Sequence, residues 1–300
     1  MTSHRRVVAA ISGLFLACAT LATTTLAPGA EAADPFTVWT VGDICDDDNE
    51  AIDCADVGDL VAADSPDYFV PLGDNQYEIG SLSAFNTYYH PKVGSKLNQV
   101  TRPVVGNHEY RTANAAGYFS YFGASAGDPA KGYYSWTAGN WKLIVLNSNC
   151  AKINRVCGYG KAESLWLRDQ LAGPETCEVL FDHHPPITDG EYAPGTTAVR
   201  GFWRRAYEGR AELFVSGHDH GYQRFAPRRT DFSLASDGVL ALVVGTGGKS
   251  LYPFTATNRS EYRQTTDFGA LRLTLTDTGY AGDFVSVTGA TMDTFSGTCR

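Results

Sequence analysis

The chain has 300 residues, of which 43% are apolar, 12% aromatic and 19% charged, a composition that excludes a disordered or fibrous chain. Its formal net charge is −9, so a nucleic-acid partner is not expected, because phosphate backbones bind positively charged surfaces. The one continuously apolar stretch lies at the N-terminus, which excludes a protein with several membrane spans.

The first 32 residues have the pattern of an export signal. Arg5 and Arg6 precede a long apolar run, and an A-x-A processing site follows at residues 30–32. A membrane anchor is the alternative, but polar residues interrupt the run and a processing site ends it. The sequence therefore predicts a signal peptide over residues 1–32, used by the Sec or the Tat route, and a secreted or extracytoplasmic chain without a membrane span.

Six cysteines follow the predicted signal, and an even number in an exported chain favours disulfides over free thiols. Sequence proximity favours three pairs, with the third left over from the first two: Cys45 with Cys54, Cys150 with Cys157, and Cys177 with Cys299. The last pair would tie the C-terminus to the core and would close the longest loop.

Residues 33–300 contain no repeat, low-complexity run or linker, so a single domain is expected. Short apolar runs predict buried strands at residues 37–41, 68–72, 103–105, 141–146, 178–181, 212–215, 239–244, 271–275 and 284–287. Patterns of helical period predict helices at residues 55–63, 162–171 and 199–207. Strands that alternate with helices indicate an α/β chain, which becomes rich in strands after Gly238.

Five of the predicted strands end directly in polar clusters. The candidate ligands in these clusters are Asp43, Asp74, Asn107 with His108, His183 with His184, and His218 with His220. Because ligands of α/β proteins gather where the carboxyl ends of strands converge, these side chains are expected at one edge of the sheet. Aspartate, asparagine and histidine at one edge predict a metal centre.

Three motifs in this pattern carry a family resemblance. They are Gly73-Asp74-Asn75-Gln76-Tyr77, which matches G-D-x-x-Y, Gly106-Asn107-His108-Glu109, which matches G-N-H-E, and Gly217-His218-Asp219-His220, which matches G-H-x-H. In this order they resemble the calcineurin-like metallophosphoesterases, and specifically the purple acid phosphatase-like branch, from about residue 43 to residue 248. The resemblance implies an α/β (α+β) fold, a metallophosphoesterase-type β-sandwich of two mixed sheets flanked by helices in four α/β/β/α layers.

The resemblance also implies two metal ions that share Asp74. The first ion would be held by Asp43, Asp74, Tyr77 and His220, and the second by Asp74, Asn107, His183 and His218. Carboxylate, phenolate, amide and imidazole ligands fit ferric iron, manganese or zinc. Fe(III) in the Tyr77 site and divalent Fe, Zn or Mn in the second would leave a net positive charge to attract phosphate, whereas two divalent ions would leave none.

The sequence departs from the family at two places. Cys45 stands where other branches of the superfamily carry a histidine ligand, so a thiolate ligand is the alternative to a disulfide at this position. Export, and Tyr77 as a substitute ligand, favour the disulfide. In the fourth motif, the H-x-P spacing to Pro185 favours His183 over the adjacent His184 as the ligand.

His108 has no ligand role in this scheme, and we expect it to protonate the leaving group. Glu109 is expected either to orient the His108 imidazole or to stand on the surface. The predicted activity is the hydrolysis of small phosphomonoesters, as in acid phosphatases, by attack of a metal-activated hydroxide. The alternatives are phosphodiester or nucleotide hydrolysis at the same centre, and a non-catalytic metal- or phosphate-binding module, against which the retained His108 counts.

Overall fold

The computed structural model describes residues 1–2, 34–46, 52–154, 157–255 and 259–300. Nearly all of the predicted signal peptide, residues 3–32, lies outside the described residues. None of the helices in these ranges is both long enough and apolar enough to span a bilayer. Contacts within the chain group Ala33–Arg300 into one compact unit, which holds the described helices and strands.

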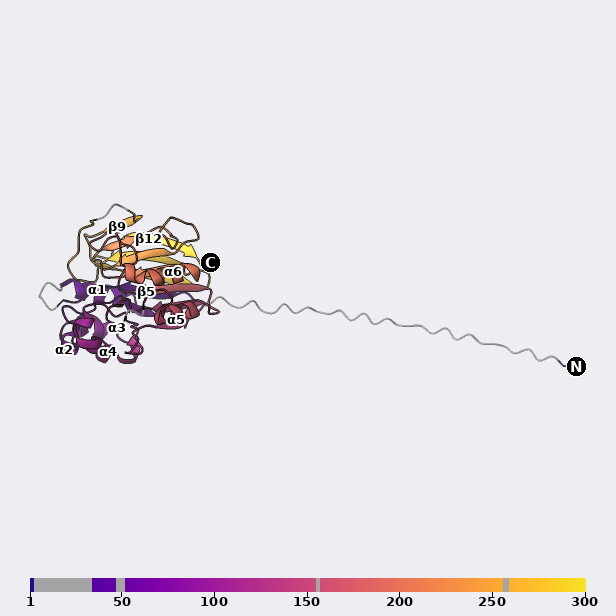
Figure 1. The fold of residues 1–300 in the computed structure, drawn as a ribbon, viewed down its shortest axis with the longest axis horizontal. Helices are drawn as coiled ribbons and strands as arrows, with labels where there is room; N and C mark the ends of the chain where they lie inside the picture. The colour runs from indigo at the N-terminus through magenta and orange to yellow at the C-terminus, as the bar shows by residue number, and fades with distance from the viewer. Residues whose placement is uncertain (3–33, 47–51, 155–156, 256–258) are drawn as a thin grey trace. The chain divides into compact units, whose positions relative to one another are not determined.

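Two mixed β-sheets form the centre of this unit (Figure 1). The smaller sheet has the order β12-β11-β10-β1-β2, in which β1 and β2 run parallel and the other neighbours run antiparallel. Its strands are β1 (Phe36–Val41), β2 (Tyr68–Pro71), β10 (Gly269–Thr276), β11 (Gly279–Ser286) and β12 (Thr291–Thr298).

The larger sheet has the order β3-β4-β5-β6-β8-β7-β9, with a parallel centre from β4 to β8 and antiparallel pairs at both ends. Its strands are β3 (Tyr134–Ala138), β4 (Trp141–Val145), β5 (Cys177–Asp182), β6 (Leu213–Ser216), β7 (Tyr222–Arg224), β8 (Leu240–Val244) and β9 (Tyr262–Gln264). The prediction of two mixed sheets is confirmed.

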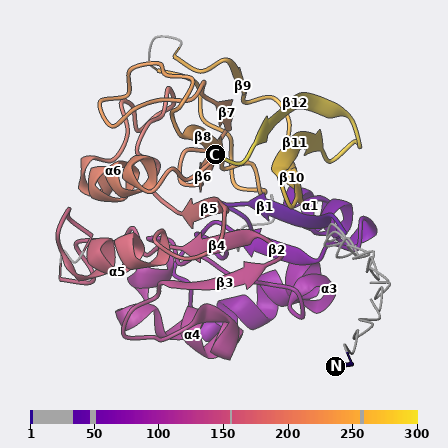
Figure 2. The same cartoon turned by 90° about the vertical axis from the view of Figure 1, so that its right-hand side faces the viewer.

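Helices flank the strands on both sides, as Figure 2 shows with α5 and α6 on one side and α1 on the other. Helices α5 (Ala162–Gln170) and α6 (Arg200–Glu208) pack against each other, and α1 (Ile52–Ala63) contacts β10. The remaining helical segments are α2 (Leu82–Ala84), the π-helix Phe85–Gly94, α3 (Ser95–Leu97), α4 (Ala116–Phe122) and the 3₁₀ turns Glu109–Arg111, Ala113–Ala115, Gly123–Ala126 and Thr197–Val199.

The alternation of side chains along a strand explains how these layers are held together. In β5, Val179 and Phe181 belong to the apolar core that includes the smaller sheet, whereas Leu180 belongs to a second core with Trp203 of α6. Because successive side chains point to opposite faces, a strand between two cores must be apolar throughout. This is why β5 appears in the sequence as a continuous apolar run.

One predicted strand is absent from the described sheets. Residues 103–105 form only an isolated bridge, in which Val104 pairs with Leu72 and donates its main-chain N–H to Pro71 at 2.8 Å. Pro103 has no N–H to extend the ladder. The other predicted strands and the three predicted helices all appear, with shifted ends.

Candidate metal centre

The candidate site lies where strands of both sheets end. Asp43 follows β1 and Asp74 follows β2 of the smaller sheet, whereas His183 follows β5 and His218 follows β6 of the larger sheet. The two sheets meet at this edge, because the main-chain N–H after β1, that of Gly42, donates to the last carbonyl of β8 at 2.8 Å. The prediction that these strand ends converge is therefore confirmed.

Three of the candidate ligands have left-handed backbone conformations. The φ angles are 62° at Asp43, 48° at Asp74 and 69° at His218, and each residue directly follows a glycine. This region is uncommon for residues other than glycine and costs about 1–3 kcal/mol, so it persists only where the surrounding structure fixes it. The sharp turns it produces direct these side chains toward the shared edge.

Close backbone approach brings a further ligand into place. A Cβ atom added at Gly106 would lie 2.1 Å from the main-chain nitrogen of Asp74, which is a steric clash, so only glycine fits at this position. The glycine therefore allows the loop that carries Asn107 to pack directly against the loop that carries Asp74.

The first group of candidate ligands surrounds the Tyr77 hydroxyl. Tyr77 donates to Asp43 Oδ1 at 2.8 Å, and its Oη lies 3.1 Å from Nε2 of His220. His220 Nδ1 lies 2.7 Å from the carbonyl oxygen of Ser250, which places the ring proton there and leaves the Nε2 lone pair toward the site. Burial, together with the Asp43 and Asp74 carboxylates, raises the pKa of Tyr77 well above 10, so its phenolate requires a nearby cation.

The second group surrounds Nε2 of His183, which lies 3.3 Å from Asp74 Oδ2, 3.0 Å from Asn107 Oδ1 and 3.2 Å from His218 Nδ1. Nδ1 of His183 lies 2.8 Å from the carbonyl oxygen of Leu72, which holds the proton on that nitrogen and leaves Nε2 as the atom that faces the site. Burial disfavours the charged form of Asp74, but His183 outweighs it and holds the pKa of this carboxyl below its usual range. Asp74 is therefore a carboxylate.

The residues fit two metal ions by their chemistry. Ligand atoms of Asp43, Asp74 and His183 lie within 4.8 Å of one another, and all three residues are buried. Two buried carboxylates, with imidazoles whose other nitrogens are bonded to main-chain carbonyls, form the arrangement that metal-binding histidines require. The structure thus brings together all the predicted ligands, which are Asp43, Asp74, Tyr77, Asn107, His183, His218 and His220. The role of each as a metal ligand stays a prediction.

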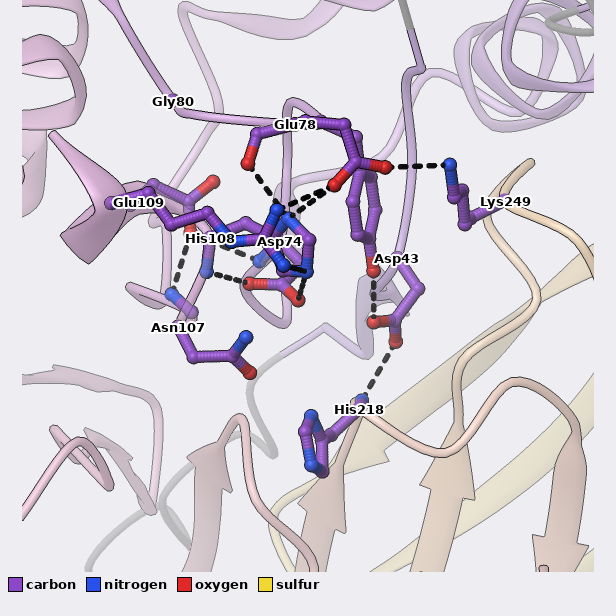
Figure 3. Close-up of polar contacts among 12 residues, drawn as sticks. Asp43, Asp74, Glu78, Gly80, Asn107, His108, Glu109, His218 and Lys249 are labelled. Carbon is purple, nitrogen blue, oxygen red and sulfur yellow. Dashed lines mark hydrogen bonds and ion pairs between the residues drawn. The ribbon is translucent and has the colours of Figure 1, made fainter. Parts of the chain in front are cut away.

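His108 lies beside these ligands, where the sequence placed it. Its main-chain N–H donates to Asp74 Oδ1 at 2.8 Å, and its Nε2 lies 3.8 Å from Oδ2 of the same carboxylate. Nδ1 of His108 lies 2.8 Å from the carbonyl oxygen of Glu78, which fixes the orientation of the ring (Figure 3). The side chain is 12% exposed, and Nη2 of Arg111 lies 3.1 Å from its Nε2.

The expected roles of Glu109 are wrong. Its side chain is fully buried and accepts the main-chain N–H groups of Asp74 at 3.0 Å, Asn75 at 2.8 Å and Gly106 at 2.7 Å. It therefore holds two loops of the site together, and the His108 ring is oriented instead by a main-chain carbonyl. The order of residues in G-N-H-E does not reveal this, because neighbours in sequence point to different partners.

Lys249 also joins the surroundings of the site and was not predicted from the sequence. Its Nζ donates to Glu78 at 3.0 Å and to Asp46, and it lies 5.0 Å from the centre of the Tyr77 ring. Figure 3 shows this lysine beyond Glu78, on the side away from His108. These charges, of which only Asp46 is buried, thus connect the loops after β1, β2 and β8.

All three predicted disulfides are present: Cys45–Cys54, Cys150–Cys157 and Cys177–Cys299. Cys45 is therefore no thiolate ligand, and the alternative reading of the first motif is wrong. The carbonyl oxygen of Cys45 accepts the main-chain N–H of Tyr77 at 2.7 Å, so this disulfide holds the loop against which Tyr77 is placed.

A family model described as calcineurin-like phosphoesterase matches residues 36–222. The chain belongs to this family. The match confirms the resemblance read from the motifs, and it supports the prediction of a phosphoesterase hydrolase. The matched region contains the strand ends and loops that carry every predicted ligand.

Two curated relatives come from Mycobacterium tuberculosis, the uncharacterized proteins Rv2577 (strain H37Rv) and MT2654 (strain CDC 1551). Each is 25% identical over an alignment of 223 positions, which covers 64% of this chain. The chain spans 41% of the length of each relative.

Solved structures share the fold. Purple acid phosphatase PPD1 from yellow lupin seeds superposes with a TM-score of 0.75 at 16% identity, covering 88% of this chain and 54% of that one. GAP50, described as the anchor in the inner membrane complex of Plasmodium, has a TM-score of 0.66 at 15% identity and 89% coverage of both chains. PhoD has a TM-score of 0.57 at 14% identity, covering 91% of this chain and 70% of that one.

Proposed function

We propose that residues 33–300 form the catalytic domain of a secreted, dinuclear metal-dependent phosphoesterase that hydrolyses small phosphomonoesters. The observation that carries the proposal is the position of His108, which lies beside the Asp74 carboxylate, outside both ligand groups and partly exposed. Three disulfides favour an extracytoplasmic location, to which residues 1–32 would direct the chain as a signal peptide.

Two metal ions are part of this proposal. Both ions would have Asp74 as a ligand. Asp43, Tyr77 and His220 would complete the first site, and Asn107, His183 and His218 the second. Bound there, such ions supply an activated water as nucleophile and neutralise the phosphoryl oxygens. We assign Fe(III) to the Tyr77 side, because a buried phenolate whose pKa is raised needs a strongly charged partner, and divalent Fe, Zn or Mn to the other side.

His108 would supply the proton for the leaving group. Its Nδ1–H is held by the carbonyl oxygen of Glu78, so Nε2 is the atom that carries the transferred proton. Nε2 lies 3.8 Å from the shared ligand Asp74 and 3.1 Å from Nη2 of Arg111, and 12% of the side chain is exposed. When the phosphate group of a substrate lies at the candidate ligands, its leaving-group oxygen would be close enough to take a proton from this nitrogen.

Two variants test the division of roles. Asp74→Asn should lower both metal content and turnover, because it weakens the shared ligand. His108→Ala should keep both metals and lower kcat by roughly 10²–10⁴-fold, as expected for the loss of a general acid. Metal content is measured by mass spectrometry, and turnover with p-nitrophenyl phosphate and with bis(p-nitrophenyl) phosphate.

His90→Ala is the matched control, because His90 lies in the π-helix Phe85–Gly94 and bonds Tyr121 at 2.8 Å, away from the ligands. Loss of metal from the His108 variant to the same extent as from the Asp74 variant would contradict the proposed roles. Faster turnover of the diester would favour a phosphodiesterase. A metal-loaded protein that hydrolyses neither ester would favour a binding module, a possibility raised by GAP50, an anchor with this fold.

A further inference from the structure

His184 borders the candidate ligands but belongs to neither ligand group. Its ring centre lies 4.4 Å from that of His218 and 4.8 Å from that of His183. One ring nitrogen of each of these three histidines lies within 4.8 Å of the others, so distance alone would admit His184 as a ligand. The hydrogen bonds around His184 decide between a ligand and another role.

The hydroxyl of Ser148 fixes the proton on the His184 ring. Ser148 Oγ accepts the main-chain N–H of His184 at 3.0 Å and that of His183 at 3.3 Å, and it lies 2.8 Å from Nδ1 of His184. A serine oxygen has two acceptor positions and one hydrogen. Because both acceptor positions are used, the hydrogen must be donated to Nδ1. The His184 ring is therefore neutral and carries its proton on Nε2.

This proton lies at the end of the ring away from the buried Ser148. His184 itself is partly exposed, and its ring packs against that of His218, a candidate ligand. Asn107 and His218 are also partly exposed, in contrast to the buried Asp74. A nitrogen that carries a proton has no lone pair for a metal, but it is a good donor to an anionic oxygen.

We propose that His184 binds the substrate by donating its Nε2–H to a phosphoryl oxygen, and that Ser148 positions it for this task. The inference rests on the proposed function, because it takes the ligand of the site to be a phosphate group. It adds a donor that the ligand set and His108 do not supply. A hydrogen bond to a charged group changes binding by about 10- to 100-fold, which sets the expected size of the effect.

Inorganic phosphate is the probe for the first experiment, with calorimetry on the metal-loaded full chain. His184→Ala should raise the phosphate Kd by about 10- to 100-fold at unchanged metal content. His184→Gln, whose side-chain amide reaches a similar point with an N–H, should recover most of this loss. In turnover, KM should rise more than kcat falls. Loss of metal from His184→Ala, or an unchanged Kd, would overturn the role.

The second experiment needs neither metal nor turnover. Long-range ¹H–¹⁵N spectra of the metal-free protein, assigned with His184→Gln, should show His184 in the Nε2–H form, and Ser148→Ala should mix the two neutral forms. An Nδ1–H form in the unaltered protein would refute the inference. Absence of ester hydrolysis by the unaltered protein would contradict the proposed function, whereas the phosphate Kd values would still decide the role of His184.

Discussion

Replacing Glu109 by alanine should weaken the fold and the metal site together, because one carboxylate holds two ligand-bearing loops. It accepts N–H groups from Asp74, Asn75 and Gly106 at 3.0, 2.8 and 2.7 Å. Asp74 is the shared candidate ligand, and Gly106 directly precedes the candidate ligand Asn107. The side chain therefore sets the distance between the two loops.

The size of the effect follows from these bonds. A hydrogen bond to a charged group contributes about 1.5–3 kcal/mol, and a buried donor left unpaired costs about 1–3 kcal/mol. Glu109→Ala leaves four main-chain donors without this acceptor, the fourth being the N–H of Gln76 at 3.4 Å, but water can enter the vacated space, so we expect a loss of about 3–5 kcal/mol in the free energy of unfolding. Glu109→Gln keeps one acceptor oxygen and turns an NH₂ group toward main-chain donors, which should cost about 1–3 kcal/mol.

Burial and the Asp74 carboxylate raise the pKa of Glu109 to about 7, so the loss is measured above that pH. Urea denaturation of the metal-free proteins, followed by tryptophan fluorescence at pH about 8 with the disulfides intact, measures it. Glu191→Ala, the same change at an exposed glutamate, is the control and should shift the free energy of unfolding by less than about 0.5 kcal/mol. The reasoning is refuted if Glu109→Ala is as stable as this control. A Glu109→Gln variant with normal stability and metal content but slow turnover would instead restore a role in orienting His108.

Three further changes have defined outcomes. Tyr77→Phe should abolish the visible charge-transfer absorption of the iron-loaded protein, and a colourless iron-loaded parent would contradict the ligand role of Tyr77. The double variant Cys45→Ser, Cys54→Ser should keep its metals but lose about 2–3 kcal/mol of stability in urea, and metal loss on changing Cys45 alone would contradict this expectation. Burial and Glu212 raise the pKa of Glu178 from 4.5 to about 8, so the folded state holds a proton that the unfolded state releases, and stability should fall as the pH rises through this interval. Glu178→Gln should therefore raise the melting temperature more at pH above about 8 than at pH about 5, and equal gains at both would refute the assignment.

The strands that carry the ligands could be predicted because they are buried on both faces. A continuous apolar run such as that of β5 stands out, and the polar cluster that follows it marks the strand end. Strands β12 and β3 escaped prediction because they lie at sheet edges, where half or more of the side chains meet solvent and polar residues are tolerated. Their pairing is set by neighbours that are distant in sequence.

The candidate ligands could be predicted from spacing, but the residues that support them could not. Glu109 acts on main-chain groups 34 and 35 residues earlier, and Lys249 reaches Asp46 across 203 residues. Main-chain donors have no sequence signature, so nothing in a motif shows which side chain accepts from them. The same is true of Ser148, whose partners lie 35 and 36 residues later.

The bond between Cys177 and Cys299 joins the two sheets covalently, because Cys177 begins β5 of the larger sheet and Cys299 follows β12, an edge strand of the smaller one. It closes a ring that contains His183, His218 and His220. A protease that cuts one loop within this ring leaves both pieces attached to each other. The histidine-bearing half of the site therefore separates from the rest of the chain only after a second cut or after reduction, which gives the protein a tolerance to nicking that packing alone would not provide.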